Sequence, residues 1–122
     1  MNATDVVDRY FKAMQAGPDG AETLFSLFRE DAVYIEPFSG APTGERHTHE
    51  GLDAIKACVQ KSWEDAPPDM TLEVDRVDVD GDVVRSEWTC RSPAFPGPMK
   101  GIDVCTVADG RIKRLEVSFA AG

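Results

Sequence analysis

The sequence predicts a single α+β domain in which helices cover one face of a curved antiparallel sheet. Three segments within the first 64 residues have the three- and four-residue apolar spacing of amphipathic helices. The second half alternates apolar and polar residues, and its Asp80-Gly81 and Asp109-Gly110 pairs each separate two alternating runs. An Asp-Gly pair in that position is the strongest short-range signal of a β-hairpin. The expected order is therefore helix, helix, short strand, helix and four long strands.

Composition narrows the class of protein. The 122 residues suit one domain, 1–122, and no apolar run approaches the roughly 20 residues of a membrane span. The N-terminus lacks the basic and apolar regions of a signal peptide, so we expect a cytoplasmic protein. Three cysteines, an odd number, do not resemble a disulfide framework. A formal net charge of −9 argues against binding to nucleic acid or to an anionic membrane.

The first helix is predicted to begin after Thr4, which can cap it, and to end at Gly17-Pro18. Its apolar stripe places Tyr10 on the buried face, where a phenol needs a hydrogen-bond partner. Tyr10 is therefore either an ordinary core tyrosine bonded to a backbone carbonyl or part of a site. The stripe consists of Val6, Val7, Tyr10, Phe11 and Met14.

Two further helices are predicted. The second begins at Asp19, which with Glu22 resembles a capping box, and runs through Arg29. The third begins after Gly51 and ends near Glu64. Its core stripe consists of Leu52, Ile55, Val59 and Trp63.

A short strand is predicted at 32–38, where a run of β-forming residues is stopped by Pro37. Tyr34, Glu36 and Phe38 share one face of it, because side chains two apart point the same way. Glu36 is therefore either flanked by aromatic groups in the interior or exposed at the end of the strand.

Residues 39–50 are rich in Gly, Pro and polar side chains and are predicted to form a loop. His47 and His49 lie in it beside Glu45 and Glu50, and all four are side chains that can bind a metal ion. Their spacing matches no recognised ligand motif, so we expect a solvated loop and no metal site.

The first hairpin of the second half, at residues 70–92, is expected to be irregular. Between Val74 and Val77 the apolar positions change parity, which indicates a bulge or a bend in a curved sheet. Helices packed against such a sheet form a cone, and its interior is the natural place for a ligand. The four strands are expected at 70–79, 83–92, 99–108 and 111–119.

Asp103 is the unusual residue of the last hairpin. It shares a strand face with Cys105 and Val107, so if these residues face the core, a carboxyl group lies inside it. A buried carboxylate without a partner is costly, and such a group either becomes neutral or marks a site. The alternative register turns Ile102 and Val104 inward and leaves Asp103 in water.

The order of elements and three local strings resemble the nuclear-transport-factor-2-like superfamily. Its cone-shaped α+β domains include SnoaL-like polyketide cyclases, scytalone dehydratase, limonene epoxide hydrolase and ketosteroid isomerase. The strings VVDRYFKAMQAG, VYIEPF and GIDVCTVADGRIKRLEVSF look most like ketosteroid isomerase. The resemblance covers nearly the whole chain. It implies a cystatin-like cone, with a curved antiparallel sheet wrapped around three N-terminal helices, and a homodimer that packs sheet against sheet.

The resemblance also implies a catalytic site. The family's helix tyrosine, an oxyanion donor, falls on Tyr10, its general base falls on Glu36, and its second donor, a protonated Asp, falls on Asp103. Glu36 would move a proton of a β,γ-unsaturated ketone through a dienolate, with no metal or organic cofactor. Two features depart from the family: Glu36 replaces a shorter Asp, and the loop at 39–50 is longer.

Other functions fit the same cone. An epoxide hydrolase of the limonene type would combine Arg85 and Glu87 with Asp103, Tyr34 and Glu36. It needs Arg85 and Glu87 to face inward, whereas the more apolar set around Ser86 and Trp88 predicts that they face outward. A polyketide cyclase or dehydratase is a further enzymatic alternative. A non-catalytic dimeric binding domain is an alternative of a different class, because this fold carries both enzymes and binding modules.

An apolar small-molecule substrate is expected, because the wall of the cone that the sequence identifies suits a steroid, a terpenoid or a polyketide equally. Aliphatic residues such as Val83, Ile102 and Val104 fall on the opposite face of the sheet and suit the contact between subunits. The residues of the wall are Met14, Phe38, Trp63, Trp88, Val117 and Phe119.

Overall fold

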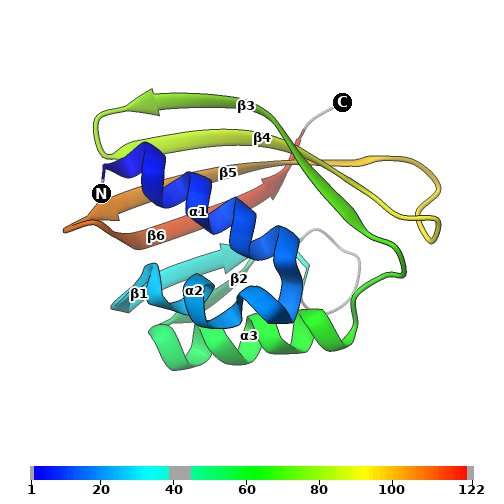
Figure 1. The fold of residues 1–122 in the computed structure, drawn as a ribbon, viewed down its shortest axis with the longest axis horizontal. Coiled ribbons are helices and arrows are strands. Elements are labelled where there is room, and N and C mark those ends of the chain that lie inside the picture. The colour runs from blue at the N-terminus through cyan, green and yellow to red at the C-terminus, as the bar shows by residue number, and fades with distance from the viewer. Residues whose placement is uncertain (1, 39–44, 121–122) are drawn as a thin grey trace.

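The fold is a curved six-stranded sheet that carries helices on its inner side (Figure 1). The computed structural model describes residues 2–38 and 45–120. The strands follow the order β2-β1-β6-β5-β4-β3, and all neighbours are antiparallel except β1 and β6, which run parallel. The predicted α+β class is confirmed. The strands are β1 (Phe28–Glu36), β2 (His47–Glu50), β3 (Thr71–Asp80), β4 (Val83–Arg91), β5 (Met99–Ala108) and β6 (Arg111–Phe119).

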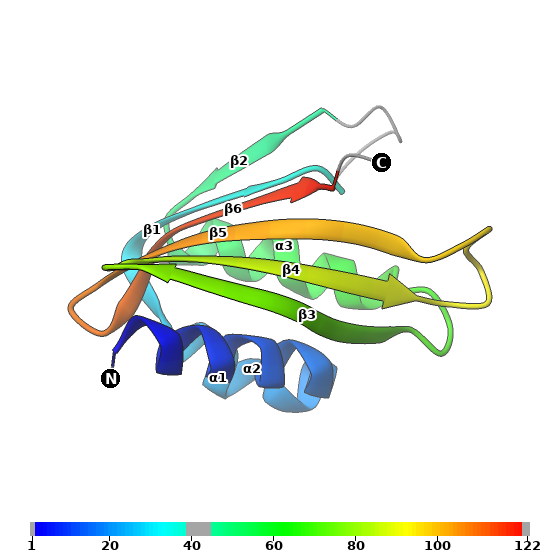
Figure 2. The ribbon, with the colours of Figure 1, turned by 90° about the horizontal axis from the view of Figure 1, so that it is seen from above.

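Three α-helices cover the inner side of the sheet. They are α1 (Ala3–Ala16), α2 (Ala21–Ser26) and α3 (Leu52–Glu64). Figure 2 shows α1 and α2 side by side beneath the strands. Helix α1 packs against β3 to β6, whereas α3 packs against β1 and β2. Within residues 2–38 and 45–120, no helix combines the length and the apolar character that crossing a bilayer requires.

The beginning of the first helix differs from the prediction. Asn2, not Thr4, is the N-cap, and its side-chain oxygen accepts a hydrogen bond from the Asp5 amide at 2.9 Å. Both residue types are good N-caps, so propensity alone does not decide between adjacent candidates.

The second helix is shorter than predicted, and the chain to Arg29 is not helical. A 3₁₀ turn, Gly17–Gly20, precedes α2, and no side chain caps that helix, so the capping role predicted for Asp19 is wrong. A Cβ atom at Gly20 would lie 2.6 Å from the backbone oxygen of Ala13 on α1, so the close approach requires glycine. At the other end, the amide of Ile112 donates to the carbonyl of Leu27 at 2.7 Å, and strand pairing with β6 replaces the last helical turn.

Both predicted hairpins are confirmed, with β3 and β4 joined after Asp80 and β5 and β6 joined at Asp109-Gly110. The register of β3 on β4 shifts between Val74 and Arg76, which confirms the predicted bulge. The predicted loop at 39–50 is partly wrong, because His47–Glu50 forms β2 and pairs with β1. Residues 39–44 of that loop lie outside the described residues.

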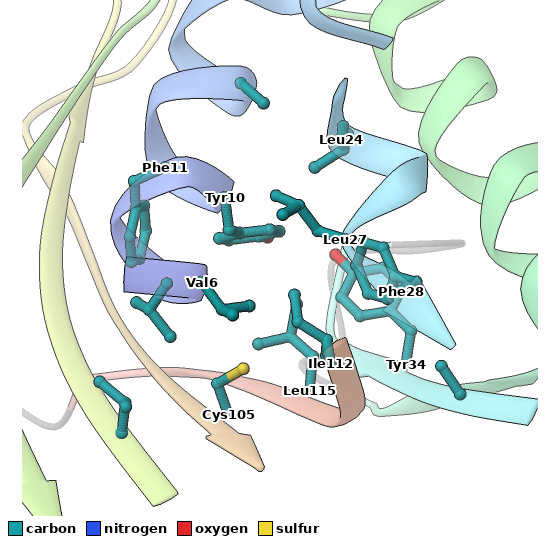
Figure 3. Packing of buried hydrophobic residues seen from close by; sticks show 14 of the residues in the cluster. Val6, Tyr10, Phe11, Leu24, Leu27, Phe28, Tyr34, Cys105, Ile112 and Leu115 are labelled. Atoms are coloured by element: carbon teal, nitrogen blue, oxygen red, sulfur yellow. The ribbon is translucent and has the colours of Figure 1, made fainter. Parts of the chain in front are cut away.

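The core lies between the helices and the inner face of the sheet (Figure 3). Val6 on α1, Ile55 on α3 and Ile112 on β6 are completely buried, so each layer contributes to it. Among residues 2–38 and 45–120, the buried polar or charged residues are Glu36, Ser86, Thr89 and Asp103. A core that buries such groups needs partners for them.

Candidate functional site

The three residues that the sequence selected are all buried. The exposed fractions are 6% for Tyr10, 1% for Glu36 and 4% for Asp103. They come from α1, from the end of β1 and from the middle of β5, which are distant in the sequence. The exposed alternative for Glu36 is therefore wrong.

Asp103 faces the interior from β5. Its direct neighbours across the sheet are Ser86 on β4 and Val117 on β6, both buried. The alternative register, with Ile102 and Val104 in the core, is wrong, because these two residues lie on the outer face and are only half-buried. The inward position follows from the two-residue period of the strand.

The carboxyl of Asp103 is both desolvated and hydrogen-bonded. Burial raises the pKa of Asp103 from 3.8 to about 7, because the charged form loses its hydration. The indole Nε1 of Trp88 donates a hydrogen bond to Oδ1 of Asp103 at 2.8 Å, which opposes this rise. Asp103 is therefore neutral in a large fraction of molecules near pH 7.

Tyr10 shares this interior with Asp103. Its pKa is raised well above 10, first by burial and then by the charge of Asp103. The ring packs edge-on against Phe11 and Phe28, with centroids 5.1 and 6.2 Å away. Figure 3 shows the ring of Tyr10 extending from α1 toward Leu27 and Phe28. Tyr10 is thus a buried phenol in the electrostatic range of a buried carboxyl.

Tyr34 lies within the electrostatic range of both buried carboxyl groups. It is buried on β1, and its pKa is raised well above 10 by burial, then by the charge of Asp103, and to a smaller extent by that of Glu36. The sequence placed Tyr34 on the same strand face as Glu36 but did not select it as a site residue. Tyr34 matters because Asp103 on β5 lies within its electrostatic range. The alternation of side chains along a single strand does not reveal that.

Glu36 is held at both oxygens. Oε2 accepts a hydrogen bond from the Phe38 amide at 2.7 Å, and Oε1 lies 3.1 Å from Nε2 of His49. The imidazole of His49 stacks on Tyr34, with ring centroids 5.9 Å apart and an interplanar angle of 30°. The carboxyl group of Glu36 is therefore fixed in place, although it is buried.

His49 is a functional candidate that the sequence reasoning missed. The sequence predicts a solvated loop at this position, but His49 lies on β2 directly opposite Tyr34. The alternation in His47-Thr48-His49-Glu50 was the available signal, since it puts both histidines on one strand face. Cys58 on α3 completes a group of metal-binding side chains with Glu36 and His49, because their donor atoms lie within 4.8 Å of one another.

The residues predicted to line the cone divide into two groups. Trp88 and Val117 are buried beside Asp103, whereas Phe38 and Phe119 are each 43% exposed. Phe38 packs against Phe119 and Trp88, with ring centroids 5.4 and 6.3 Å apart. These aromatic side chains therefore run from the surface to the hydrogen-bond donor of Asp103.

The other two predicted wall residues lie elsewhere on the core. Met14 is partly buried on α1 and packs against the hydrophobic cluster. Trp63 is partly buried on α3 and contacts Phe25, with ring centroids 6.0 Å apart. A role for either residue in binding a substrate stays a prediction.

Ser86 adds a polar group beside Asp103. It is 1% exposed, and its Oγ has no hydrogen-bond partner within residues 2–38 and 45–120. A buried hydroxyl in this state is uncommon in folded proteins, and a polar atom of a ligand would satisfy it. The interior thus offers three groups that can donate a hydrogen bond: Tyr10, Ser86, which pairs with Asp103 across the strands, and neutral Asp103.

A surface depression lies where β1 and β6 begin, at the other end of β1 from Glu36. It is lined by Arg29, Glu30, Asp31, Asp109 and Arg111. Arg29 is already paired with Asp31 and with Asp109, each at 2.9 Å. The depression is therefore a charged feature of the surface and is separate from the buried site.

Solved structures share this fold over almost the whole chain. A candidate polyketide cyclase from Sinorhizobium meliloti is 28% identical, with 97% of this chain and 100% of the other covered and a TM-score of 0.75. A candidate ketosteroid isomerase from Kribbella flavida is 22% identical, with coverages of 98% and 78% and a TM-score of 0.75. An NTF2-like protein of unknown function from Burkholderia pseudomallei is 20% identical, with coverages of 98% and 92% and a TM-score of 0.81.

Sequence comparison assigns the family. No curated protein sequence matches the chain. The family profile of the SnoaL-like domain matches residues 7–115, a range that includes Tyr10, Glu36 and Asp103. The chain is therefore a member of the SnoaL-like domain family.

Proposed function

We propose that this protein is a cofactor-independent enzyme that isomerises a β,γ-unsaturated ketone by moving a proton through a dienolate. The observation that carries the proposal is Asp103, a buried carboxyl whose pKa is about 7 and which lies in electrostatic range of the buried phenol of Tyr10. A neutral carboxyl and a phenol are both hydrogen-bond donors. Two such donors in one apolar interior suit an oxygen atom that becomes negatively charged.

Glu36 is the general base in this proposal. Its carboxylate removes a proton from the carbon between the carbonyl and the double bond, and the protonated Glu36 returns it to the γ-carbon. The bonds from the Phe38 amide and His49 hold the carboxylate in one orientation. A positioned base of this kind typically contributes about 100- to 10,000-fold to the rate.

Tyr10 and Asp103 stabilise the dienolate. Both donate to its oxygen, which carries the charge while the proton is on Glu36. Such donors act more strongly in a buried site than in water, because the surroundings there have a low dielectric constant. The same logic explains why ketosteroid isomerases keep a carboxylic acid neutral at neutral pH.

The substrate is an apolar ketone with a ring system or a long chain. Phe38, Phe119 and Trp88 offer aromatic surface from the exterior to the donors, and Val117 continues it beside Asp103. The candidate ketosteroid isomerase from Kribbella flavida shares the fold and is consistent with this substrate class.

A polyketide cyclase is the second candidate. The candidate cyclase from Sinorhizobium meliloti is 28% identical over nearly the full length of both chains. Cyclisation also begins when a base removes a proton next to a carbonyl, so the same three residues would serve. The epoxide hydrolase alternative has less support, because Arg85 and Glu87 bond to each other at 3.1 Å on the outer face of the sheet.

The test is to incubate the purified protein with a 5-ene-3-ketosteroid and to follow the absorbance of the conjugated enone. The proposal predicts an increase that Glu36→Gln lowers by about 100-fold or more, because the base is lost while its shape is kept. Glu30→Gln is the matched control, since Glu30 is exposed on the same strand. No increase with folded wild-type protein would contradict the isomerase and leave the cyclase or a binding domain as the preferred function.

A further inference from the structure

Three side chains of metal-binding type meet at one edge of the buried site. Glu36 ends β1, His49 lies on β2 and Cys58 lies on α3, three elements that are side by side in Figure 1. One oxygen, one nitrogen and one sulfur atom from these residues lie within 4.8 Å of one another. The oxygen and nitrogen, Oε1 of Glu36 and Nε2 of His49, are 3.1 Å apart.

The spacing of these atoms suits a tetrahedral ion. Zinc binds oxygen and nitrogen at about 2.0 to 2.2 Å and sulfur at about 2.3 Å, which separates two ligands of a tetrahedron by roughly 3.3 to 3.6 Å. The distance between Oε1 of Glu36 and Nε2 of His49 is close to this value, and Sγ of Cys58 lies within 4.8 Å of a ligand atom of each of these residues. We propose that Glu36, His49 and Cys58 form a three-ligand binding site for Zn²⁺.

The chemistry of the ligands selects zinc over Mg²⁺ and Ca²⁺. A thiolate and an imidazole are poor ligands for Mg²⁺ and Ca²⁺, which prefer oxygen, whereas both are typical ligands of zinc. The ion replaces the hydrogen bond between Nε2 of His49 and Oε1 of Glu36. Three protein ligands leave a fourth position for water or for a polar group of a ligand, as in catalytic zinc sites.

Regular structure holds the three ligands in place. Tyr34 pairs with His49 in the register of β1 and β2, and it also stacks on the imidazole ring. The Gly51 amide donates to the Ala32 carbonyl at 2.8 Å, which ties the beginning of α3 to β1. Partners that orient a ligand raise metal affinity by roughly 10- to 100-fold. The scaffold thus presents the ligands with little freedom to separate.

The only metal-binding group that the sequence suggested consists of different residues. It combines His47 and His49 with Glu45 and Glu50, whose spacing matches no ligand motif. In the structure His49 instead joins Glu36 and Cys58, which are separated from it in the chain by residues 39–44 and by the first turns of α3. Such a set of ligands is invisible to a search for short motifs.

Zinc at this site would inhibit proton transfer, an extension that rests on the proposed function. An ion bound to Glu36 occupies the lone pairs that accept the proton. Occupancy would therefore prevent the general base from acting without any change in Tyr10 or Asp103. The metal site itself does not depend on catalysis and can be tested without a substrate.

The experiment is titration of the reduced protein with Co²⁺ chloride, followed by absorption spectroscopy. A tetrahedral site with one thiolate predicts intense visible d–d bands and a near-ultraviolet charge-transfer band that saturate at one equivalent and disappear when Zn²⁺ is added. Cys58→Ala should abolish the charge-transfer band. Cys90→Ala is the matched control, because Cys90 is a buried cysteine on β4 outside the cluster and should leave the spectrum unchanged.

Two results would overturn the site. One is a wild-type spectrum without the charge-transfer band, and the other is the same band in folded Cys58→Ala. If Cys58→Ala is unfolded by circular dichroism, His49→Gln replaces it and should weaken cobalt binding by about 10-fold or more, the size of effect that smaller perturbations of metal sites already produce. Unchanged affinity in His49→Gln would also overturn the site.

Activity assays separate this proposal from the previous one. If the protein isomerises the steroid, Zn²⁺ should inhibit wild type and leave Cys58→Ala active. Isomerase activity that zinc does not affect, despite cobalt binding, would overturn the inhibition alone. If the steroid does not react, the proposed function fails while the cobalt spectrum still decides the metal site.

Discussion

The indole of Trp88 on β4 reaches diagonally to the adjacent strand β5 and donates a hydrogen bond to Asp103 at 2.8 Å. In the register of β4 and β5, Trp88 lies opposite Gly101, while Asp103 lies opposite Ser86. The ring covers Gly101 so closely that an added Cβ atom would lie 2.0 Å from it. The absence of a side chain at Gly101 is therefore what allows the indole to reach the carboxyl group.

Gly101→Ala should destabilise the protein by about 1 to 3 kcal/mol, the usual cost of overfilling a packed interior. The indole would have to move, and its bond to Asp103 would lengthen or break. Chemical denaturation followed by circular dichroism measures the change. Gly97→Ala is the control, because no atom lies within 4 Å of a Cβ there, and an equal loss in both variants would contradict the explanation.

Trp88→Phe should raise the pKa of Asp103 further, because the hydrogen bond from the indole stabilises the carboxylate. If neutral Asp103 is a donor in catalysis, the decline of kcat/KM at high pH should then move to a higher pH. Rate profiles of wild type and variant between pH 5 and 9 test this. Trp63→Phe, which changes the tryptophan of α3, should keep the wild-type profile.

The pH dependence of stability should reveal Asp103 directly. Below about pH 4 the carboxyl is neutral in the folded and unfolded states. Between about pH 4 and 7 the unfolded chain loses this proton while the folded protein keeps it, so the contribution of Asp103 to stability falls as pH rises. The total fall is on the order of 4 kcal/mol, and it stops above about pH 7, where both states are ionised.

Asp103→Asn provides the comparison that isolates this effect, because the other carboxyl groups titrate in both proteins. The free energy of unfolding of wild type should decline relative to that of Asp103→Asn as pH is raised from 4 to 7. Denaturant titrations at several pH values measure the difference. A difference that stays constant over this range would mean that burial does not raise the pKa of Asp103.

Substitutions of Asp103 also distinguish a neutral donor from a carboxylate. Asp103→Asn keeps an N–H group for the dienolate oxygen, whereas Asp103→Leu keeps only the bulk. The leucine variant should lose about 100- to 1,000-fold in turnover, as expected for a missing oxyanion donor, and the asparagine variant much less. Equal losses in two folded variants would argue that Asp103 acts as a carboxylate.

A homodimer remains a prediction. The aliphatic side chains on the outer face of the sheet favour it. Val83 is 37% exposed there, and Ile102 and Val104 on the neighbouring strand are half-buried. Sedimentation equilibrium at micromolar concentration should give twice the mass of the chain, and Val104→Lys should give the monomer. Val79→Lys is the control, since Val79 is 50% exposed but pairs with Val84 on the inner side.

The inward position of Asp103 could be predicted because it depends on local rules. The Asp109-Gly110 turn sets the pairing of β5 with β6, and the two-residue period then decides which side chains are buried. Tyr10 was predictable for the same reason, since the stripe of α1 is a local pattern. In both cases, the apolar side chains that decide which face of the strand or helix is buried lie within a few residues of each other.

The partners of these residues depend on tertiary contacts and could not be predicted. Trp88 bonds Asp103 only because Gly101 leaves space, and His49 meets Glu36 only because a four-residue strand pairs at the edge of the sheet. The chain at Leu27 likewise leaves its predicted helix because β6 offers a strand partner. Propensity is a weak guide wherever such long-range pairing is available.

The parallel pairing of β1 with β6 has a consequence for folding kinetics. Strand β6 follows every other described strand in the chain, so during synthesis β1 waits with one hydrogen-bonding edge open after its partner β2 has been made. Contacts between distant segments form slowly, and an open strand edge can pair with another chain. The exposure of this edge of β1 on the ribosome is therefore a step at which the chain is vulnerable to aggregation.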